Sequence, residues 1–261
     1  MKKTLLAAAL LSLVSGAASA SSTMTLKWEH KLLDGRTDRP KFEFNHRMDN
    51  GFAFGFEQAW QYDRSKKELE TGFAPEQYEL TFKTDYQHRW GDRNEHQAGG
   101  VLDYQTKETA NTVRAGAYYG YRVTRDFSFK TRARYAQNID RLSLGDNPRY
   151  RNDYNKEMRF DLWLTYRWSD FTFVYDLIHL RKLSSEKNSS GQEQHTFDNN
   201  SQSAWEHEFS AEYRLPNARA HAFYGKFKLK QELLKNSHQN SEYDWYGKRD
   251  NAIEFGYKYR F

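Results

Sequence analysis

The sequence predicts an all-β protein, a transmembrane antiparallel β-barrel of about twelve strands with short periplasmic turns and long extracellular loops. Three observations predict this fold. They are an N-terminal segment typical of export, segments of about ten residues in which apolar and polar residues alternate, and connections that alternate between short and long. Alternation of this kind is typical of strands that face lipid on one side and a polar lumen on the other.

The composition fits neither a water-soluble globular domain nor a disordered chain. Charged residues make up 29% of the 261 residues and the mean hydropathy is −1.02, yet aromatic residues reach 16%. A water-soluble domain this polar has little apolar material for a core, whereas disordered chains are poor in aromatic rings. The rings are expected instead in girdles at the two membrane interfaces.

Residues 1–20 have the features of a secretory signal peptide. Lys2 and Lys3 precede an apolar run over 5–14, and Ala18-Ser19-Ala20 provides small residues for cleavage near Ala20. Removing this segment leaves a single barrel domain over 21–261 with 38 basic and 35 acidic residues, a net charge of +3. The chain has no cysteine, and no later segment approaches the roughly 20 apolar residues of a spanning helix.

Twelve segments alternate in this way, and each is predicted to be a strand. They are 23–33, 38–48, 52–62, 76–87, 95–106, 112–124, 127–138, 156–168, 171–182, 204–215, 220–230 and 251–261.

The clearest segments illustrate the pattern in chain order. In 38–48, Phe42 and Phe44 alternate with charged and amide side chains, and 156–168 repeats the pattern with Met, Phe, Leu, Tyr and Trp. In 127–138, Lys130, Arg132 and Arg134 take every second position, so a strand places three cations on one face and apolar residues on the other. The last segment alternates aromatic residues with Glu, Gly, Lys and Arg.

The connections support the same architecture. Tight turns are predicted at 49–51, 124–126, 169–170 and 215–218, a looser turn at 91–92, and long polar loops at 63–75, 139–155, 183–203 and 231–250, while 34–37 and 107–111 are intermediate. Short turns at one end and long loops at the other are typical of bacterial outer-membrane barrels. An even strand number places both termini in the periplasm.

Basic residues at the inward positions of the predicted strands form two groups. The first group, on the sixth to eighth strands, consists of Arg114, Arg122, Lys130, Arg132, Arg134, Arg159 and Arg167. The second, on the last two and first two strands, consists of Lys226, Lys228, Lys230, Lys258, Arg260, Lys27 and Arg47. Strands half a barrel apart face each other, so the two groups predict facing basic tracks for anions.

The alternative interpretation is that these cations pair with wall carboxylates and only brace the barrel. The inward carboxylates are Glu29, Glu43, Glu57, Glu79, Asp85, Asp103, Asp161, Asp176, Glu206, Glu208, Glu212 and Glu254. We expect pairing to involve roughly half of the cations, each hydrated pair contributing about 0–1 kcal/mol. The seventh strand has no inward carboxylate of its own. Inward Tyr118, Trp163 and Tyr224 are candidates for stacking on sugar rings or for filling space.

The whole mature chain resembles the oligogalacturonate-specific porin family, which includes the sialic-acid-induced outer-membrane channel. The resemblance rests on RPKFEFNHRMDNGFAFGFEQAW with its Asn50-Gly51-Phe52 turn, on the basic seventh strand, and on the terminal GYKYRF. It implies a small monomeric barrel that passes acidic sugars along basic residues of both tracks. This chain departs from the family pattern in its many lumenal carboxylates and in having more Lys than Arg on the closure side. The terminal Phe261 also resembles the C-terminal signal read by the barrel-assembly machinery.

The sequence therefore predicts a porin for passive diffusion of anionic oligosaccharides, in contact with outer-membrane lipid and lipopolysaccharide. One alternative is a barrel enzyme of the lipase or protease type, for which His30, His46, His179 and His207 are candidates, although no nucleophile is recognised beside them. Another is a non-conducting structural barrel. No cofactor, metal site or nucleic-acid partner is predicted, because the nine His are not clustered and the basic residues point inward.

Overall fold

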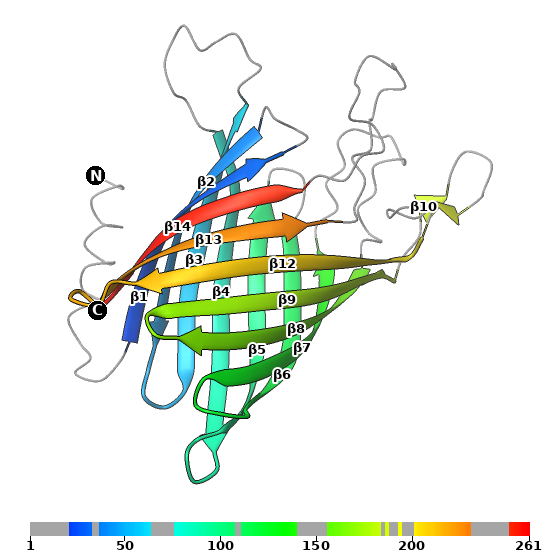
Figure 1. Ribbon diagram of the computed structural model, residues 1–261. Coiled ribbons are helices and arrows are strands. Elements are labelled where there is room, and N and C mark those ends of the chain that lie inside the picture. The colour runs from blue at the N-terminus through cyan, green and yellow to red at the C-terminus, as the bar shows by residue number, and fades with distance from the viewer. Residues whose placement is uncertain are drawn as a thin grey trace, which may run out of the picture.

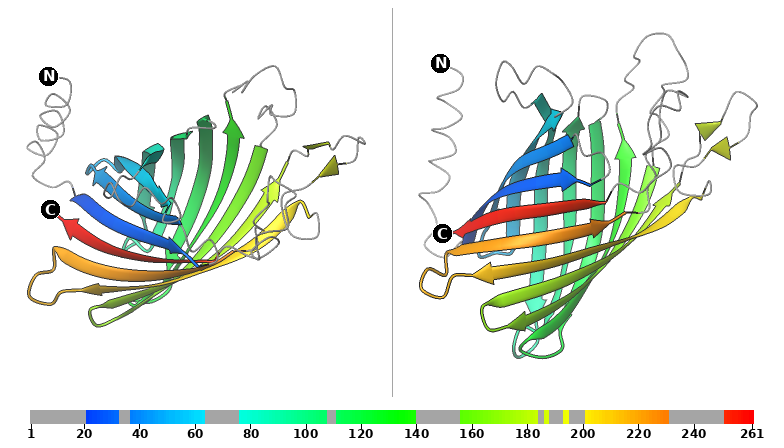
Figure 2. Two further views of the ribbon diagram at one scale, coloured as in Figure 1. Left: turned by 90° about the horizontal axis from the view of Figure 1, so that it is seen from above. Right: turned by 45° about the horizontal axis from the view of Figure 1, so that its top comes forward.

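The chain folds into one closed antiparallel β-barrel (Figure 1), described here from a computed structural model. The structure describes residues 21–32, 37–63, 76–107, 111–139, 156–183, 186–187, 193–194, 201–230 and 251–261. Neighbouring strands follow one another in the order β1-β14-β13-β12-β9-β8-β7-β6-β5-β4-β3-β2. The sheet curls back on itself so that the first strand pairs with the last (Figure 2).

All twelve predicted strands are confirmed, with bounds that shift by no more than three residues. They are β1 (Ser21–Lys31), β2 (Thr37–Arg47), β3 (Phe52–Asp63), β4 (Glu76–Trp90), β5 (His96–Lys107), β6 (Asn111–Arg122), β7 (Phe127–Asn138), β8 (Lys156–Trp168), β9 (Phe171–Lys182), β12 (Ser203–Arg214), β13 (His221–Leu229) and β14 (Ala252–Arg260).

Two further strands were not predicted. β10 (Glu186–Lys187) and β11 (Glu193–Gln194) form a two-stranded sheet within the segment expected to be a polar loop. Most of the other long connections fall outside the described residues. Among the described residues, no helix is long and apolar enough to cross a membrane.

Five short turns join β2–β3, β4–β5, β6–β7, β8–β9 and β12–β13 at one end of the barrel, which we call the turn end. The first strand begins and the last strand ends there, since Ser22 and Phe261 exchange backbone hydrogen bonds of 2.9 and 3.0 Å. In the β2–β3 turn, Gly51 adopts a φ of +90°, a conformation that favours glycine, and the Asn50 side chain accepts from the backbone amide of Phe52 at 3.1 Å.

The outward face is apolar and aromatic, as the alternation predicts. Leu26, Phe82 and Phe255 are 57%, 51% and 60% exposed. Near the turn end the rings contact one another across strands, with Phe52 and Tyr86 4.8 Å apart at their centroids and similar contacts between β6 and β7 and between β9 and β12. A band of this kind suits a lipid environment with an aromatic girdle at its edge.

Candidate functional site

The inner face is identified by ion pairs that skip a strand. Lys228 on β13 contacts Glu29 on β1 at 2.5 Å, although β14 lies between these strands. Arg134 on β7 likewise reaches Asp103 on β5 at 3.2 Å, across β6. Side chains converge on the concave face of a barrel and diverge on the convex face, so these contacts place the charged side chains in the lumen. The strand registers place the predicted path residues on this same face, except Lys230, which directly follows β13.

The first predicted track lies on β6, β7 and β8, and we call it the β6–β8 track. Three of its members make ion pairs: Arg132 and Arg159 contact Asp161 at 2.9 and 2.6 Å, and Arg134 contacts Asp103. Arg114 donates instead to the side-chain amide oxygen of Gln105. The remaining members, Arg122, Lys130 and Arg167, have no carboxylate partner within the described part of the chain.

The second predicted track lies on β13, β14, β1 and β2, and we call it the closure track. Lys27 pairs with Glu43 and Glu57, Lys228 with Glu29 and Glu254, and Lys226 with Glu208. Three further members are paired in the same way: Arg47 with Asp85, and both Lys258 and Arg260 with Glu212. Only Lys230 has no carboxylate partner among the described residues.

The two tracks therefore differ in how far their charge is neutralised. Six of the seven closure-track cations are ion-paired, but only three of the seven on the β6–β8 track are. Pairing is thus more extensive overall than half, and it is unevenly distributed. The lumen has one wall with unneutralised cations, on β6–β8, facing a wall in which cations and carboxylates alternate.

A central cavity of about 630 Å³ lies between these walls. Arg132, Arg134, Arg159 and Trp163 line it from β7 and β8, and Lys226 and Glu208 from β13 and β12. Asp176 of β9 also lines it, and one of its carboxylate oxygens is buried without a hydrogen-bond partner in the described structure. The cavity thus offers mostly cationic donors from one wall and both charges from the other.

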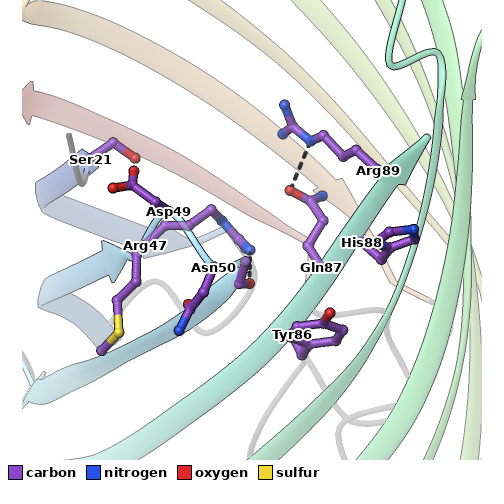
Figure 3. A pocket seen from close by; sticks show the side chains of 10 residues that line it. Ser21, Arg47, Asp49, Asn50, Tyr86, Gln87, His88 and Arg89 are labelled. Carbon is purple, nitrogen blue, oxygen red and sulfur yellow. Dashed lines mark hydrogen bonds between the residues drawn. The ribbon is translucent and has the colours of Figure 1, made fainter. Parts of the chain in front are cut away.

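A second cavity of about 460 Å³ lies at the turn end (Figure 3). Ser21 and the β2–β3 turn line one side, and the end of β4 lines the other. Arg89 donates to the side-chain oxygen of Gln87 at 3.1 Å, and Arg47 donates to the backbone oxygen of Gly51 at 2.9 Å. Arg47 lines both cavities, so the two are adjacent along the lumen.

Besides Arg89, three lumenal cations that make ion pairs were not singled out from the sequence. Arg39 contacts Glu29 at 3.7 Å, Lys107 contacts Glu79 at 3.3 Å, and Lys182 contacts Glu157 at 2.6 Å. All three occupy the same alternate positions as the predicted cations. The alternation of apolar and polar residues could therefore have identified them as lumenal. All three lie near the ends of their strands, where the alternation is least distinct.

One expectation about rival chemistry is wrong. A nucleophile does stand beside a candidate histidine, because the Ser22 hydroxyl lies 2.8 Å from His46 Nδ1. Both side chains are buried on the outward face, and His46 packs against the ring of Phe54 at 5.2 Å. Ser22 and His46 are 5% and 8% exposed, so the pair has little contact with solvent in the described structure. The other candidates are engaged differently: His30 with Asp38 at 2.7 Å, His207 with the hydroxyl of Tyr175 at 2.8 Å, and His179 against Trp205 at 4.5 Å.

Comparison with known proteins agrees with this geometry. The family model of the oligogalacturonate-specific porin protein (KdgM) matches residues 15–261. Among solved structures, the NanC porin superposes with a TM-score of 0.65 at 14% identity, covering 90% of this chain and 98% of that chain. The KdgM porin gives 0.56 at 13% identity over 91% and 99%, and the KdgM porin in complex with disordered oligogalacturonate gives 0.54 at 14% identity over the same shares. No curated protein sequence matches the chain.

Proposed function

Because the chain belongs to the family of oligogalacturonate-specific porins, we propose that it is an outer-membrane channel through which anionic oligosaccharides diffuse passively. The observation that carries the proposal is the β6–β8 track. Arg114, Arg122, Lys130 and Arg167 face the lumen without an ionic partner among the described residues, so a passing anion meets cations that no carboxylate contacts directly.

The chemistry of these side chains suits carboxylate solutes. The planar guanidinium group donates two parallel hydrogen bonds to one carboxylate, and the ammonium group of Lys acts as a compact point charge. A conducting path needs several binding sites of similar, modest strength, so that a solute that enters is also able to leave. Cations spaced along three neighbouring strands supply such a series, while the ion-paired closure wall opposes them without trapping the solute.

The proposal extends to the cellular setting of the barrel. We infer export by the signal peptide with cleavage near Ala20, and a monomeric barrel surrounded by outer-membrane lipid and lipopolysaccharide. The apolar outward face supports the lipid environment. We also infer that the assembly machinery reads Phe261, whose ring stacks on Tyr259 at 5.5 Å beside the β1–β14 closure.

Bilayer conductance tests this function directly. Purified protein in a planar lipid bilayer should carry an anion-selective current, and oligogalacturonate should reduce that current more than a neutral maltodextrin of equal length. Sialic acid serves as a short acidic comparison. A barrel that carries no current would be structural, and equal block by acidic and neutral sugars would refute the proposed solute class. Hydrolysis of lipid or peptide by the same preparation would instead support an enzyme.

A further inference from the structure

Two Gly–Tyr–Lys arrangements lie on the lumenal face, five strands apart in the twelve-stranded barrel. In the first, the Tyr118 ring covers Gly99, and a Cβ atom added to Gly99 would lie 2.5 Å from Tyr118 Cζ. In the second, Tyr224 covers Gly256 in the same way, and an added Cβ atom would overlap its ring. In both, the missing side chain leaves the space that the ring occupies.

Each ring carries a lysine over its face. Lys130 Nζ lies 3.7 Å from the centroid of Tyr118, and Lys258 Nζ lies 4.7 Å from the centroid of Tyr224. Tyr118 is only 5% exposed, and its hydroxyl donates to the backbone oxygen of Tyr86 at 3.3 Å. The space above Gly99 and the hydrogen bond to Tyr86 therefore hold the Tyr118 ring in place, and the ring in turn orients the amine of Lys130.

The two lysines differ in their ionic partners. Lys258 makes an ion pair of 2.7 Å with Glu212, and Tyr224 donates to Glu254 at 2.8 Å. Lys130 has no carboxylate partner in the described chain. The acidic charges that act on its amine are those of Asp85, which pairs with Arg47, and Asp161, which pairs with Arg132 and Arg159. An aromatic face attracts a cation but has no net charge, so the positive charge of Lys130 is not cancelled.

Trp163 completes the first arrangement. Lys130 pairs with Trp163 across the β7–β8 ladder, and its amine lies 5.5 Å from the indole centroid. Arg132 lies 4.8 Å from the same ring, which lines the central cavity. An indole face at the cavity wall next to an uncancelled amine offers a stacking surface for a sugar ring together with a donor for its acidic substituent.

We propose that Lys130, oriented by Tyr118 and placed beside Trp163, is the binding site for one carboxylate of an acidic sugar in transit. This inference rests on the proposed function and narrows it to one site on one wall. Lys258 occupies the equivalent position on the opposite wall but is neutralised, so it serves as a structural counterpart without the binding role. Because Lys130 is held by an aromatic ring and not by a carboxylate, its amine has a fixed position and can still bind a carboxylate of the solute.

Matched variants test the site. Lys130→Met and Lys258→Met remove the same charge from equivalent positions, and Arg260 still pairs with Glu212 when Lys258 is absent. In single-channel recordings, Lys130→Met should weaken block by trigalacturonate roughly three- to tenfold, the loss of about one charge-assisted contact. Lys258→Met should change it by less than about twofold. Tyr118→Leu keeps the charge, so it should leave anion selectivity unchanged but weaken block, whereas Tyr224→Leu should not.

The outcomes separate this site from the general function. If the wild type is blocked by trigalacturonate but the two Lys→Met variants weaken block equally, Lys130 adds only to the overall field and the proposal is wrong. If Tyr118→Leu is blocked like the wild type, the orienting role of the ring is wrong. A wild type that is not blocked by trigalacturonate at all overturns the proposed function itself. Heat-dependent mobility of each variant in gels verifies that the barrel is folded before recording.

Discussion

Replacing Asp161 by asparagine tests how the cations of the β6–β8 track are held. The side chain of Asp161 is 0% exposed and accepts from Arg132 at 2.9 Å and from Arg159 at 2.6 Å. One carboxylate thus compensates two guanidinium groups from adjacent strands. Asparagine has nearly the same shape and keeps one oxygen acceptor, but it loses the charge and one acceptor.

The expected cost follows from the burial of the group. Breaking a buried pair by removing one partner typically costs about 3–5 kcal/mol, because a charge is left uncompensated. Arg132 and Arg159 remain partly hydrated in the lumen and the introduced amide would retain one hydrogen bond, so we expect the lower end, about 3 kcal/mol of unfolding free energy. The same substitution frees two cations for solutes, so anion selectivity should rise while stability falls.

Urea unfolding of the refolded barrel in detergent, followed by tryptophan fluorescence, measures the first effect, and bilayer reversal potentials measure the second. Asp126→Asn is the matched control, since Asp126 lies exposed in the β6–β7 turn and makes no ion pair with the described residues. The reasoning would be refuted if both variants unfold at the same urea concentration. It would also be refuted if Asp161→Asn lowered anion selectivity.

Three further predictions concern the closure, the terminus and the mouth. Lys228→Met removes the contacts with Glu29 and Glu254 across the closure and should lower the free energy of urea unfolding by about 2 kcal/mol. This cost is smaller than that of breaking an isolated buried pair, because Lys41 still contacts both carboxylates. An unchanged unfolding free energy would contradict a bracing role. Deleting Phe261 should lower the folded fraction of barrel in outer membranes, measured by heat-dependent gel mobility, and an unchanged fraction would rule out its role in assembly. Arg89→Gln should weaken block by acidic sugar added from the turn-end side by about twofold, with little change from the other side; a symmetric effect would argue against a site at the mouth.

The strands were predictable from the sequence because lipid on one side and water on the other impose a period of two on every strand. The terminal segment with Phe255 and Tyr257 outward and Lys258 and Arg260 inward is one example, and the structure places it in β14. The short strands β10 and β11 lack that constraint. Each has only two residues, too few for any alternation to appear.

The identity of lumenal residues was also predictable, but their ionic partners were not. Lys228 and Glu29 are 199 residues apart in the chain and meet only because the barrel closes with a particular stagger between strands. Alternation fixes the face of a residue but not its height relative to a strand two places away. The prediction of two facing basic tracks therefore could not show that the closure track is neutralised more completely than the β6–β8 track.

Glycines are a second reason why the ionic partners could not be predicted from the sequence. Gly116 faces the lumen opposite Arg134, and a Cβ atom added to it would lie 2.5 Å from the backbone oxygen of Ala133 and 3.0 Å from Arg134 Cα. The missing side chain leaves the path across β6 along which Arg134 reaches Asp103. A partner reached across an intervening strand depends on such local space, which no pattern within a single strand reveals.

The most direct test of the account compares anion selectivity between walls. Reversal potentials across a salt gradient should show anion selectivity in the wild type, a clear loss when Arg122, Lys130 and Arg167, unpaired among the described residues, are all replaced by Gln, and a smaller loss when the ion-paired Lys226, Lys258 and Arg260 are replaced in the same way. The difference is expected because the β6–β8 track carries the less neutralised charge. Equal losses from both walls, or no loss from the first, would contradict the claim that this track sets selectivity.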